Sequence, residues 1–410
     1  MVSFSALLQE GRAPTRREEI SAVLALSWPA IVQQLMLTLV QYIDTAMVGS
    51  LGPNATASVG VVSSSVWLFN GLLGAAATGF AVQVAQHIGA RETERARSVV
   101  RESMLFSLLF GVFMGSAAAA LSFPLPGLLG AEEAIRPDAS AYFLIVGCSM
   151  PFLMAINLMS SLLRCMGDTR TPMLFNITLN ILNTIFNFLL IYEPREASVF
   201  GLRVFLPGAG LGVPGAALGS ALASLLVALL FLRRFLSRDF PLRISLRDRF
   251  RFTRDCLSAM IRIAIPQAMA HTASCGAQIA VTVIVAGLGT QAVAANSLAV
   301  TAEALCYQPG YGVSTAATTL VGQSIGAGRR DLAVRFARVS TLLGMAIMTG
   351  TGLLMFLFAE PLIGMFTPDA DVMRLGASVL RIEAFAEPLF AASIVASGAF
   401  SGAGDTKWAF

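Results

Sequence analysis

The chain has 410 residues, of which 56% are hydrophobic and only 13% are charged. Because an ordinary soluble domain carries roughly 25% charged residues, this composition excludes the soluble globular class. The formal net charge of +4 could indicate a nucleic-acid partner. The positions of the basic residues decide whether it does.

Ten apolar stretches follow one another along the chain, and each is long enough for a membrane helix. A helix needs about 20 apolar residues to cross roughly 30 Å of hydrocarbon. The sequence therefore predicts an all-α polytopic membrane protein with ten complete helices, at residues 26–50, 59–86, 103–123, 139–162, 172–192, 210–232, 263–287, 296–322, 339–358 and 376–400. The arm before the first stretch lacks the apolar core and cleavage site of a secretory signal, so we expect the first helix to direct insertion.

The basic residues lie mostly in alternate loops. Of the 28 lysines and arginines, 23 fall on one side of the membrane when successive helices cross in opposite directions: the N-terminal arm, 91–101, 164–170, 233–262, 329–338 and Lys407. Loops rich in lysine and arginine stay cytoplasmic. The pattern predicts a multi-pass protein with a cytoplasmic N-terminus, and it explains the basic surplus without a nucleic acid. We expect the protein in the cell inner (plasma) membrane.

The sequence contains an internal repeat. Two parts of the chain align without a gap at a shift of 237 residues, which matches Pro29 with Pro266, "VAQHIGA" (84–90) with "VGQSIGA" (321–327), and "GDTR" (167–170) with "GDTK" (404–407). One period contains six helices, an even number, so both copies enter the membrane in the same direction. Parallel repeats are typical of transporters in which one bundle rocks against the other around a central cleft.

The repeat divides the chain into three parts. Residues 1–235 form a first lobe with helices 1–6, residues 236–262 a basic cytoplasmic linker, and residues 263–410 a second lobe with helices 7–10 and the start of helix 11. Counterparts of helices 5 and 6 would lie beyond residue 410. The chain is then either a fragment of a twelve-helix parent, which we favour, or a protein without the last two helices.

The sequence carries no motif of an enzyme or of a metal site. Paired aspartates, HExxH and GxSxG are missing, so we expect neither catalysis nor a bound cofactor or metal. The five cysteines have no CxxC or other paired spacing. We expect buried small hydrophobic side chains at Cys148, Cys165, Cys256, Cys275 and Cys306.

Four acidic residues stand inside the predicted spans, where an ionised group costs about 2.5–3.5 kcal/mol. They are Asp44, Glu303, Glu383 and Glu387, and each has an apolar partner in the other repeat. A carboxyl group in an apolar cleft can take and release a proton near physiological pH. These side chains are therefore the first candidates for ion coupling and substrate binding.

Several motifs together resemble the multidrug and toxic compound extrusion (MATE) family, in its bacterial DinF-like and NorM-like types. They are "DTAMVGSLG" (44–52), "AATTLVGQSIGAG" (316–328), the two Gly-Asp-Thr turns, and Asn183, Asn187 and "LLIY" (189–192). The resemblance implies a MATE/MOP-type transporter fold with two lobes around a V-shaped cavity. It also implies an antiporter that exports organic cations and other toxic compounds, driven by protons or sodium ions.

The resemblance assigns ion coupling to Asp44 in the first helix. Gln41 lies one turn earlier on the same face. In the fifth helix, Asn180, Asn183 and Asn187 have helical spacing and would offer neutral amides to the carboxylate. The rival interpretation of these side chains is polar packing between helices.

A hinge is predicted at Pro29, which removes a backbone hydrogen bond from the first helix. Protonation of Asp44 would let the helix bend there and close the cavity around the first lobe. Some relatives carry aspartate where Asn187 stands, and sodium prefers several oxygen ligands. We therefore expect proton coupling, with sodium as the alternative ion.

The substrate cavity is expected to be lined by Tyr142, Asn180, Ser220, Glu303 and Glu387. Tyr142 and Ser220 occupy places where relatives line the cavity of the first lobe. NorM-like relatives carry carboxylates in helices 7 and 10, where this chain has Ser274 and Phe390. Glu387, one turn from Phe390, is the possible substitute.

Two other membrane functions fit the sequence less well. A lipid-linked precursor flippase would be expected to show a strongly cationic cavity, and the predicted spans contain hardly any lysine or arginine. A channel would need rings of like charge, which are missing. The expected partners are small toxic organic cations and the lipid bilayer, and the chain is expected to act as a monomer.

Overall fold

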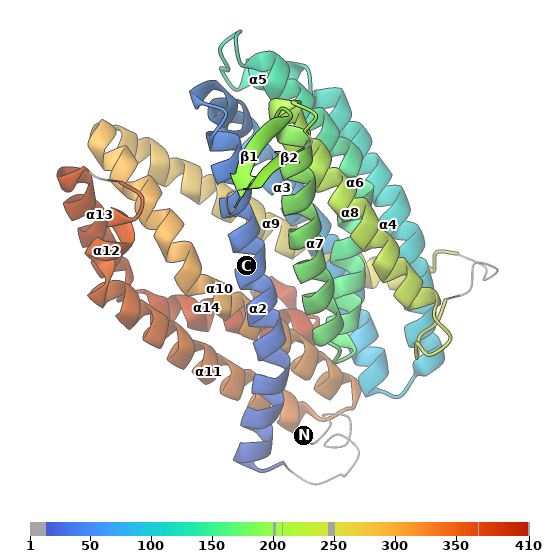
Figure 1. The fold of residues 1–410 in the computed structure, drawn as a ribbon. Helices are drawn as coiled ribbons and strands as arrows, with labels where there is room; N and C mark the ends of the chain where they lie inside the picture. The colour runs from blue at the N-terminus through green and yellow to red at the C-terminus, as the bar shows by residue number, and fades with distance from the viewer. Residues whose placement is uncertain (1–13, 200–201, 207, 245–250, 368, 409–410) are drawn as a thin grey trace.

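The computed structural model describes residues 14–199, 202–206, 208–244, 251–367 and 369–408, and part of the predicted linker lies outside them. Helices dominate the fold (Figure 1). The first repeat contains α2 (Arg16–Gly49), α3 (Pro53–Gly89), α4 (Thr93–Leu121), α5 (Pro124–Leu128), α6 (Arg136–Cys165), α7 (Arg170–Ile191) and α8 (Gly212–Leu236). The second contains α9 (Arg254–Ala286), α10 (Thr290–Gly326), α11 (Arg330–Leu357), α12 (Ala359–Gly364), α13 (Ala370–Glu383), α14 (Glu387–Ala403) and the 3₁₀ turn η1 (Thr406–Trp408).

The predicted all-α membrane class is confirmed. Eight helices of the described chain have the length and apolar composition to cross a membrane. The 37-residue α10 is not among them, since threonine, serine and glutamine interrupt its apolar residues. Sequence analysis missed a small antiparallel hairpin between α7 and α8, formed by β1 (Arg195–Val199) and β2 (Leu202–Leu206).

Nine predicted spans each overlap one long helix, although α2, α4, α9 and α11 begin nine or ten residues before the predicted span; the tenth span was wrong. The stretch 376–400 is two helices, because α13 ends at Glu383 and α14 begins at Glu387. Pro388 stands in the first turn of α14 and cannot donate a backbone hydrogen bond to the turn before it. Its repeat counterpart Pro151 lies inside the continuous α6, so proline alone does not account for the break.

The backbone repeats as the sequence does. Residues with positive φ occur at matching positions of the two copies: Gly52 (113°) and Gly289 (104°), Arg91 (61°) and Gly328 (72°), Gly167 (92°) and Gly404 (79°). Arg91 is the only one of these six with a side chain. The loops between corresponding helices therefore turn in the same way, which supports a duplicated scaffold.

The first helix of each repeat packs on both repeats. The first half of α2 contributes Val23 and Leu26 to a buried cluster with Leu320 and Phe336 of the second repeat. Its last turn packs Val48 against Ile191 and Val213 of the first repeat, in a separate cluster. Met260 at the start of α9 likewise joins the core of the first repeat. Both α2 and α9 therefore contact residues of the two repeats. The domain boundaries at 235 and 263 stay predictions.

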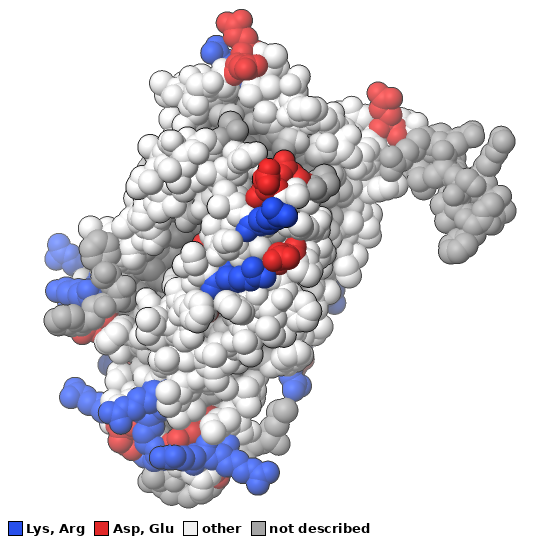
Figure 2. Space-filling view, turned by 90° about the vertical axis from the view of Figure 1, so that its left-hand side faces the viewer, with Lys and Arg blue, Asp and Glu red and all other residues white. Residues whose placement is uncertain are grey.

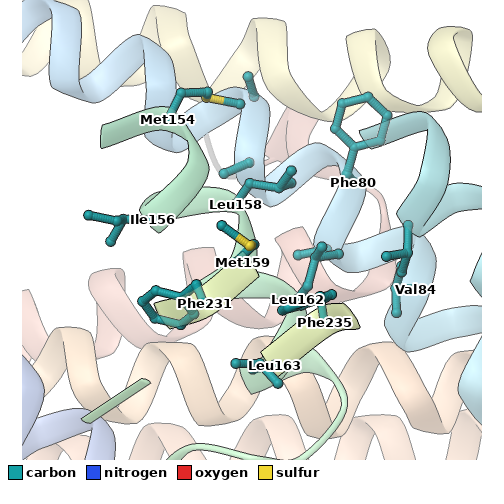
Figure 3. Close-up of a cluster of buried hydrophobic side chains, with 14 of the residues drawn as sticks. Phe80, Val84, Met154, Ile156, Leu158, Met159, Leu162, Leu163, Phe231 and Phe235 are labelled. Atoms are coloured by element: carbon teal, nitrogen blue, oxygen red, sulfur yellow. The ribbon is translucent and has the colours of Figure 1, made fainter. Parts of the chain in front are cut away.

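The largest apolar core lies in the first repeat, between α3, α6 and α8. Phe80, Leu158, Leu162, Phe231 and Phe235 are fully buried there (Figure 3). In lipid, close packing rather than exclusion of water holds helices together, so small residues are favoured where helices meet. Gly111 and Gly115 of α4 meet this requirement, because they lie against Pro151 and Gly147 of α6.

Charged side chains are concentrated at one end of the molecule. Figure 2 shows a broad surface with few charges and a dense group of basic side chains at its lower end. In the loop between α3 and α4 at this end, His87 and Arg95 hold the pKa of Glu92 below its ordinary value. The cysteine prediction is partly wrong, because Cys148 is exposed on α6 and Cys275 is only half-buried, whereas the other three are buried.

Candidate functional site

Asp44 points from α2 toward α7. The side-chain nitrogen Nδ2 of Asn187 donates to Asp44 Oδ1 at 2.7 Å and to Asn183 Oδ1 at 3.2 Å. An amide nitrogen has two hydrogens, so it can make both bonds at once. Asn187 is 0% exposed and Asp44 is half-buried. The acid is therefore held by an amide that water does not reach.

The other predicted amides continue this polar connection. Asn183 Nδ2 donates to Ser220 Oγ of α8 at 2.8 Å, and Asn180 Nδ2 donates to the backbone oxygen of Met36 in α2 at 2.9 Å. The structure thus brings Asp44, Asn180, Asn183, Asn187 and Ser220 together, across three helices. We call these five residues the α7 amide cluster.

A glycine of α8 makes room for the α7 amide cluster. A Cβ added to Gly219 would collide with Asn187 Oδ1 and would lie 3.0 Å from the backbone nitrogen of Asn187. The φ angle of Gly219 is not positive, so close approach of the two helices, rather than a special backbone conformation, requires the glycine. Sequence analysis placed Ser220 near the acid but did not identify this neighbour.

Two predicted neighbours of Asp44 behave differently. Tyr142 of α6 packs beside Val48 and Ala55 and lies within electrostatic range of Asp44. Gln41 is exposed, and the hydrogen bond of this residue uses its backbone oxygen, which accepts from Thr45 Oγ1. Helical spacing placed Gln41 on the face of Asp44, and the structure does not join the two side chains.

The opposite side of α2 carries a polar contact with α10 that sequence analysis missed. The hydroxyl of Tyr42 donates to the backbone oxygen of Thr301 at 2.6 Å. Closer to Pro29, Gln308 Nε2 donates to Thr38 Oγ1 at 2.8 Å. Thr38 and Tyr42 are polar residues in an apolar stretch of α2, and this pattern was the sequence signal that could have indicated the contact. The helix that carries the acid is thus also tied to the second repeat.

A second acidic site lies on α10, α13 and α14. Glu387 is only 1% exposed, and neither of its carboxyl oxygens has a hydrogen-bond partner among the described residues. One oxygen of Glu383 is in the same situation. Glu303 is half-buried and lies within electrostatic range of both. The break between α13 and α14 thus sets two glutamates beside the one on α10.

Aromatic rings border this second site. Tyr307 of α10 packs edge-on against Phe390 and against Tyr311, with ring centroids 6.0 Å apart in each pair. Such a mixture of carboxylates and aromatic faces can attract an organic cation. In the described part of the chain, no group of three histidine, cysteine or acidic residues could hold a metal ion.

Pro29 is buried inside α2, which continues through it without interruption. It lies just after Leu26, the last residue of α2 in the cluster with the second repeat. Asp44 and its contact with α7 lie farther along the same helix. The proline therefore stands between the cluster of Val23 and Leu26 with the second repeat and the part of α2 that carries the acid, although Ile31, Thr38 and Tyr42 after it still contact α10.

The chain matches known transporters along nearly all of its length. The MatE family profile matches residues 29–189 and 266–410, and the two matches begin at the same 237-residue shift as the repeat. The chain is 28% identical over 408 residues to "Probable multidrug resistance protein NorM" of Thermotoga maritima, covering 98% of this chain and 83% of the relative. It is also 28% identical to "Multidrug resistance protein PmpM" of Pseudomonas aeruginosa, with 95% and 80% covered.

Solved structures share the fold. One is described as the "outward-facing conformation of a multidrug resistance MATE family transporter of the MOP superfamily"; it has a TM-score of 0.87, 24% identity, and coverage of 95% of this chain and 84% of its own. A MATE structure in complex with MaD3S has the same TM-score at 23% identity, with the same coverage. At this identity the likeness establishes the fold, and the site must be argued from the residues of this chain.

Proposed function

The chain belongs to the MatE family of multidrug and toxic compound extrusion transporters, and from this premise we propose that it exports organic cations and other toxic compounds in exchange for protons by alternating access. The observation that supports the proposal best is the hydrogen bond between Asn187 and Asp44. The bond gives Asp44, an acid inside a membrane helix, one fixed partner in its own lobe. The helix that carries Asp44, α2, also contacts the other lobe. Proton occupancy of Asp44 can then bias the relation between the lobes.

The coupling step uses the difference between a charged and a neutral Asp44. The ionised carboxylate accepts strongly from the Asn187 amide, because hydrogen bonds to charged acceptors are the stronger class. Protonation weakens the need for that donor and leaves α2 free to bend at Pro29. Asn183 accepts from the same amide nitrogen and is itself fixed by Ser220, while Asn180 joins α7 to the backbone of Met36 in α2. Gln41 remains a proposed neighbour of the ion path.

Proton coupling fits the α7 amide cluster better than sodium coupling. Sodium needs several oxygen ligands, whereas Asn187 presents a nitrogen to Asp44 and Asn183 presents a nitrogen to Ser220. Sodium remains the alternative coupling ion. No cofactor is part of the proposal.

Substrates are proposed to bind between the two acidic sites. Tyr142, Asn180 and Ser220 line the first lobe, and Glu303 and Glu387 supply negative charge in the second. A flippase of lipid-linked precursors is a weaker candidate, because the half-buried Arg164 in the last turn of α6 donates to Gln33 and Ser161. These contacts do not form the cationic cavity that a flippase would be expected to show. Small toxic cations are thus the proposed substrate class.

The chain is a multi-pass membrane protein. We place it in the cell inner membrane with the arginine-rich end and the N-terminus in the cytoplasm, and we propose that it works as a monomer without a nucleic-acid partner. The 1–235 and 263–410 lobes, with the 236–262 linker between them, are the proposed moving units.

Dye transport by the whole chain in proteoliposomes tests the proposal. With an imposed pH gradient, transport of a fluorescent organic cation should be fast, should stop on addition of an uncoupler, and should not change when sodium is replaced by choline. Asp44→Asn should lose proton-driven transport. The matched control is Asp239→Asn, an exposed aspartate after α8, which should behave as the parent. A sodium requirement together with an active Asp44→Asn variant would refute proton coupling and favour the sodium alternative.

A further inference from the structure

The repeated motifs "VAQHIGA" (84–90) and "VGQSIGA" (321–327) meet each other in space. They end α3 and α10, at the arginine-rich end of the molecule. Both motifs hold a glutamine and, three residues later, a glycine at equivalent positions. In the sequence these motifs align the repeats, and the second is also part of the resemblance to the MATE family. The proposed coupling mechanism assigns neither of them a role.

Each glutamine donates to the other repeat. Gln323 Nε2 of α10 donates to the backbone oxygen of Cys165, the last residue of α6, at 2.7 Å. Gln86 Nε2 of α3 donates to the backbone oxygen of Gly402, in the last turn of α14, at 3.2 Å. The donors are repeat counterparts, and so are the acceptors. The carbonyls at a helix C-terminus lack intrahelical partners, so each glutamine satisfies an acceptor that its own helix leaves open.

Each glycine faces the glutamine backbone of the other repeat. A Cβ added at Gly89 would collide with the backbone oxygen of Gln323, and one added at Gly326 would collide with the backbone oxygen of Gln86. Neither glycine has a positive φ. Both are therefore needed for the close approach of α3 and α10, as small residues are at other crossings of membrane helices.

The contact lies at the buried end of the two helices, whereas their other halves are more exposed. From Leu73 to Ala85 most α3 residues are buried, whereas most between Pro53 and Leu72 are exposed or half-exposed. In α10 burial likewise increases after Pro309, and Gln323 is only 4% exposed. Thr319 adds a third bond between the repeats at this end, from its Oγ1 to the backbone oxygen of Arg164 at 3.1 Å.

We propose that Gln86, Gly89, Gln323 and Gly326 form a two-fold gate that holds the arginine-rich end of the transporter closed and must part when that end opens. The proposal rests on alternating access, which is part of the proposed function. Its specific content is that the two glutamine donors release the ends of α6 and α14 together, because each pair is the counterpart of the other. A transporter in which this contact cannot form should populate the form that is open at the arginine-rich end.

Distances between spin labels test the gate independently of transport. Glu94 of α4 and Asp331 of α11 are repeat counterparts, both exposed at the arginine-rich end. In a background without native cysteines, labels at these two positions report the separation of the lobes in nanodiscs. Gly326→Ala is expected to add a longer-distance population at the expense of the parent distance. Gly60→Ala on α3, where an added Cβ meets nothing within 4 Å, should leave the distribution unchanged.

A second variant keeps the test valid if Gly326→Ala does not fold. Gln86→Met with Gln323→Met preserves length and flexibility but removes both donors, and it should also add the longer population. An unchanged distribution in a folded Gly326→Ala or in the double methionine variant overturns the proposal. Loss of dye transport in the parent, with the longer population still appearing in the variants, would refute the proposed function and leave the gate intact.

Discussion

Gly219 of α8 is the position where one added carbon perturbs the acid without touching it. The Cβ of an alanine there would collide with Asn187 Oδ1 and would stand 3.2 Å from Asn187 Cγ. Either the amide rotates away or α8 moves from α7. Both responses disturb the 2.7 Å bond to Asp44.

The expected change in stability follows from three effects. Overpacking costs about 1–3 kcal/mol, and loss of one hydrogen bond between membrane helices costs about 0.6–1.7 kcal/mol. Alanine is favoured over glycine inside a helix by about 1 kcal/mol. We therefore expect Gly219→Ala to lower the free energy of unfolding by about 0.5–4 kcal/mol.

Thermal unfolding and proton-driven dye transport measure the two consequences. Transport should fall at least about tenfold, which corresponds to about 1.4 kcal/mol in the barrier. The matched control is Gly74→Ala in α3, where the added Cβ meets nothing within 4 Å. This variant should keep the parent transport rate and a melting temperature at or above that of the parent. If Gly219→Ala equals this control in both measurements, the close packing around Asn187 does not matter and the reasoning fails.

Three further substitutions separate structural from functional roles. Glu102 accepts from the backbone nitrogen of Thr253 at 2.8 Å and from Thr253 Oγ1 at 2.9 Å, at the start of α9. Glu102→Gln weakens this acceptor, and thermal denaturation should show a loss of stability of about 1–2 kcal/mol, as for the loss of an N-cap. An equal loss in the exposed Glu94→Gln would contradict this assignment. Glu387→Gln should leave the melting temperature at pH 8 unchanged or raise it, because the buried carboxyl has no partner among the described residues. Cation transport should weaken. A lowered melting temperature would contradict a role of Glu387 in substrate binding alone. Tyr42→Phe removes a 2.6 Å bond to α10 and should cost about 0.6–1.7 kcal/mol of stability, which an unchanged melting curve would disprove.

Hydropathy and the repeat were sufficient to predict most of the fold. Apolar length sets where a chain can cross a bilayer, so nine spans each overlap one helix, whereas polar first turns made four helices longer than predicted. The same signal could not locate the break between α13 and α14, because the residues on both sides of it remain apolar on average. Pro388 marked the place, but its counterpart Pro151 shows that a proline in such a helix can also be accommodated.

Helical spacing identified which residues of α7 could act together, since Asn180, Asn183 and Asn187 share one face. It could not establish whether Gln41 reaches Asp44, because residues on one face of a helix need not orient their side chains alike. The partner of Tyr42 could not be predicted from the sequence either. A contact between α2 and α10 depends on how the two repeats pack, and the sequence pattern gives their order but not their crossing.

The packing of α2 explains why a single acid in this helix can influence two lobes. Its first half belongs by contact to the second repeat, where Glu19 is paired with Arg335 of α11 at 2.6 Å. Its later part turns Asp44 toward α7 of the first repeat, while Tyr42 still holds α10. Any change in the strength of the Asp44 contact therefore acts between two bodies that the same helix joins. A carboxylate at an equivalent depth on α4 or α8 would change the packing of one lobe only, since those helices make their main contacts within the first repeat.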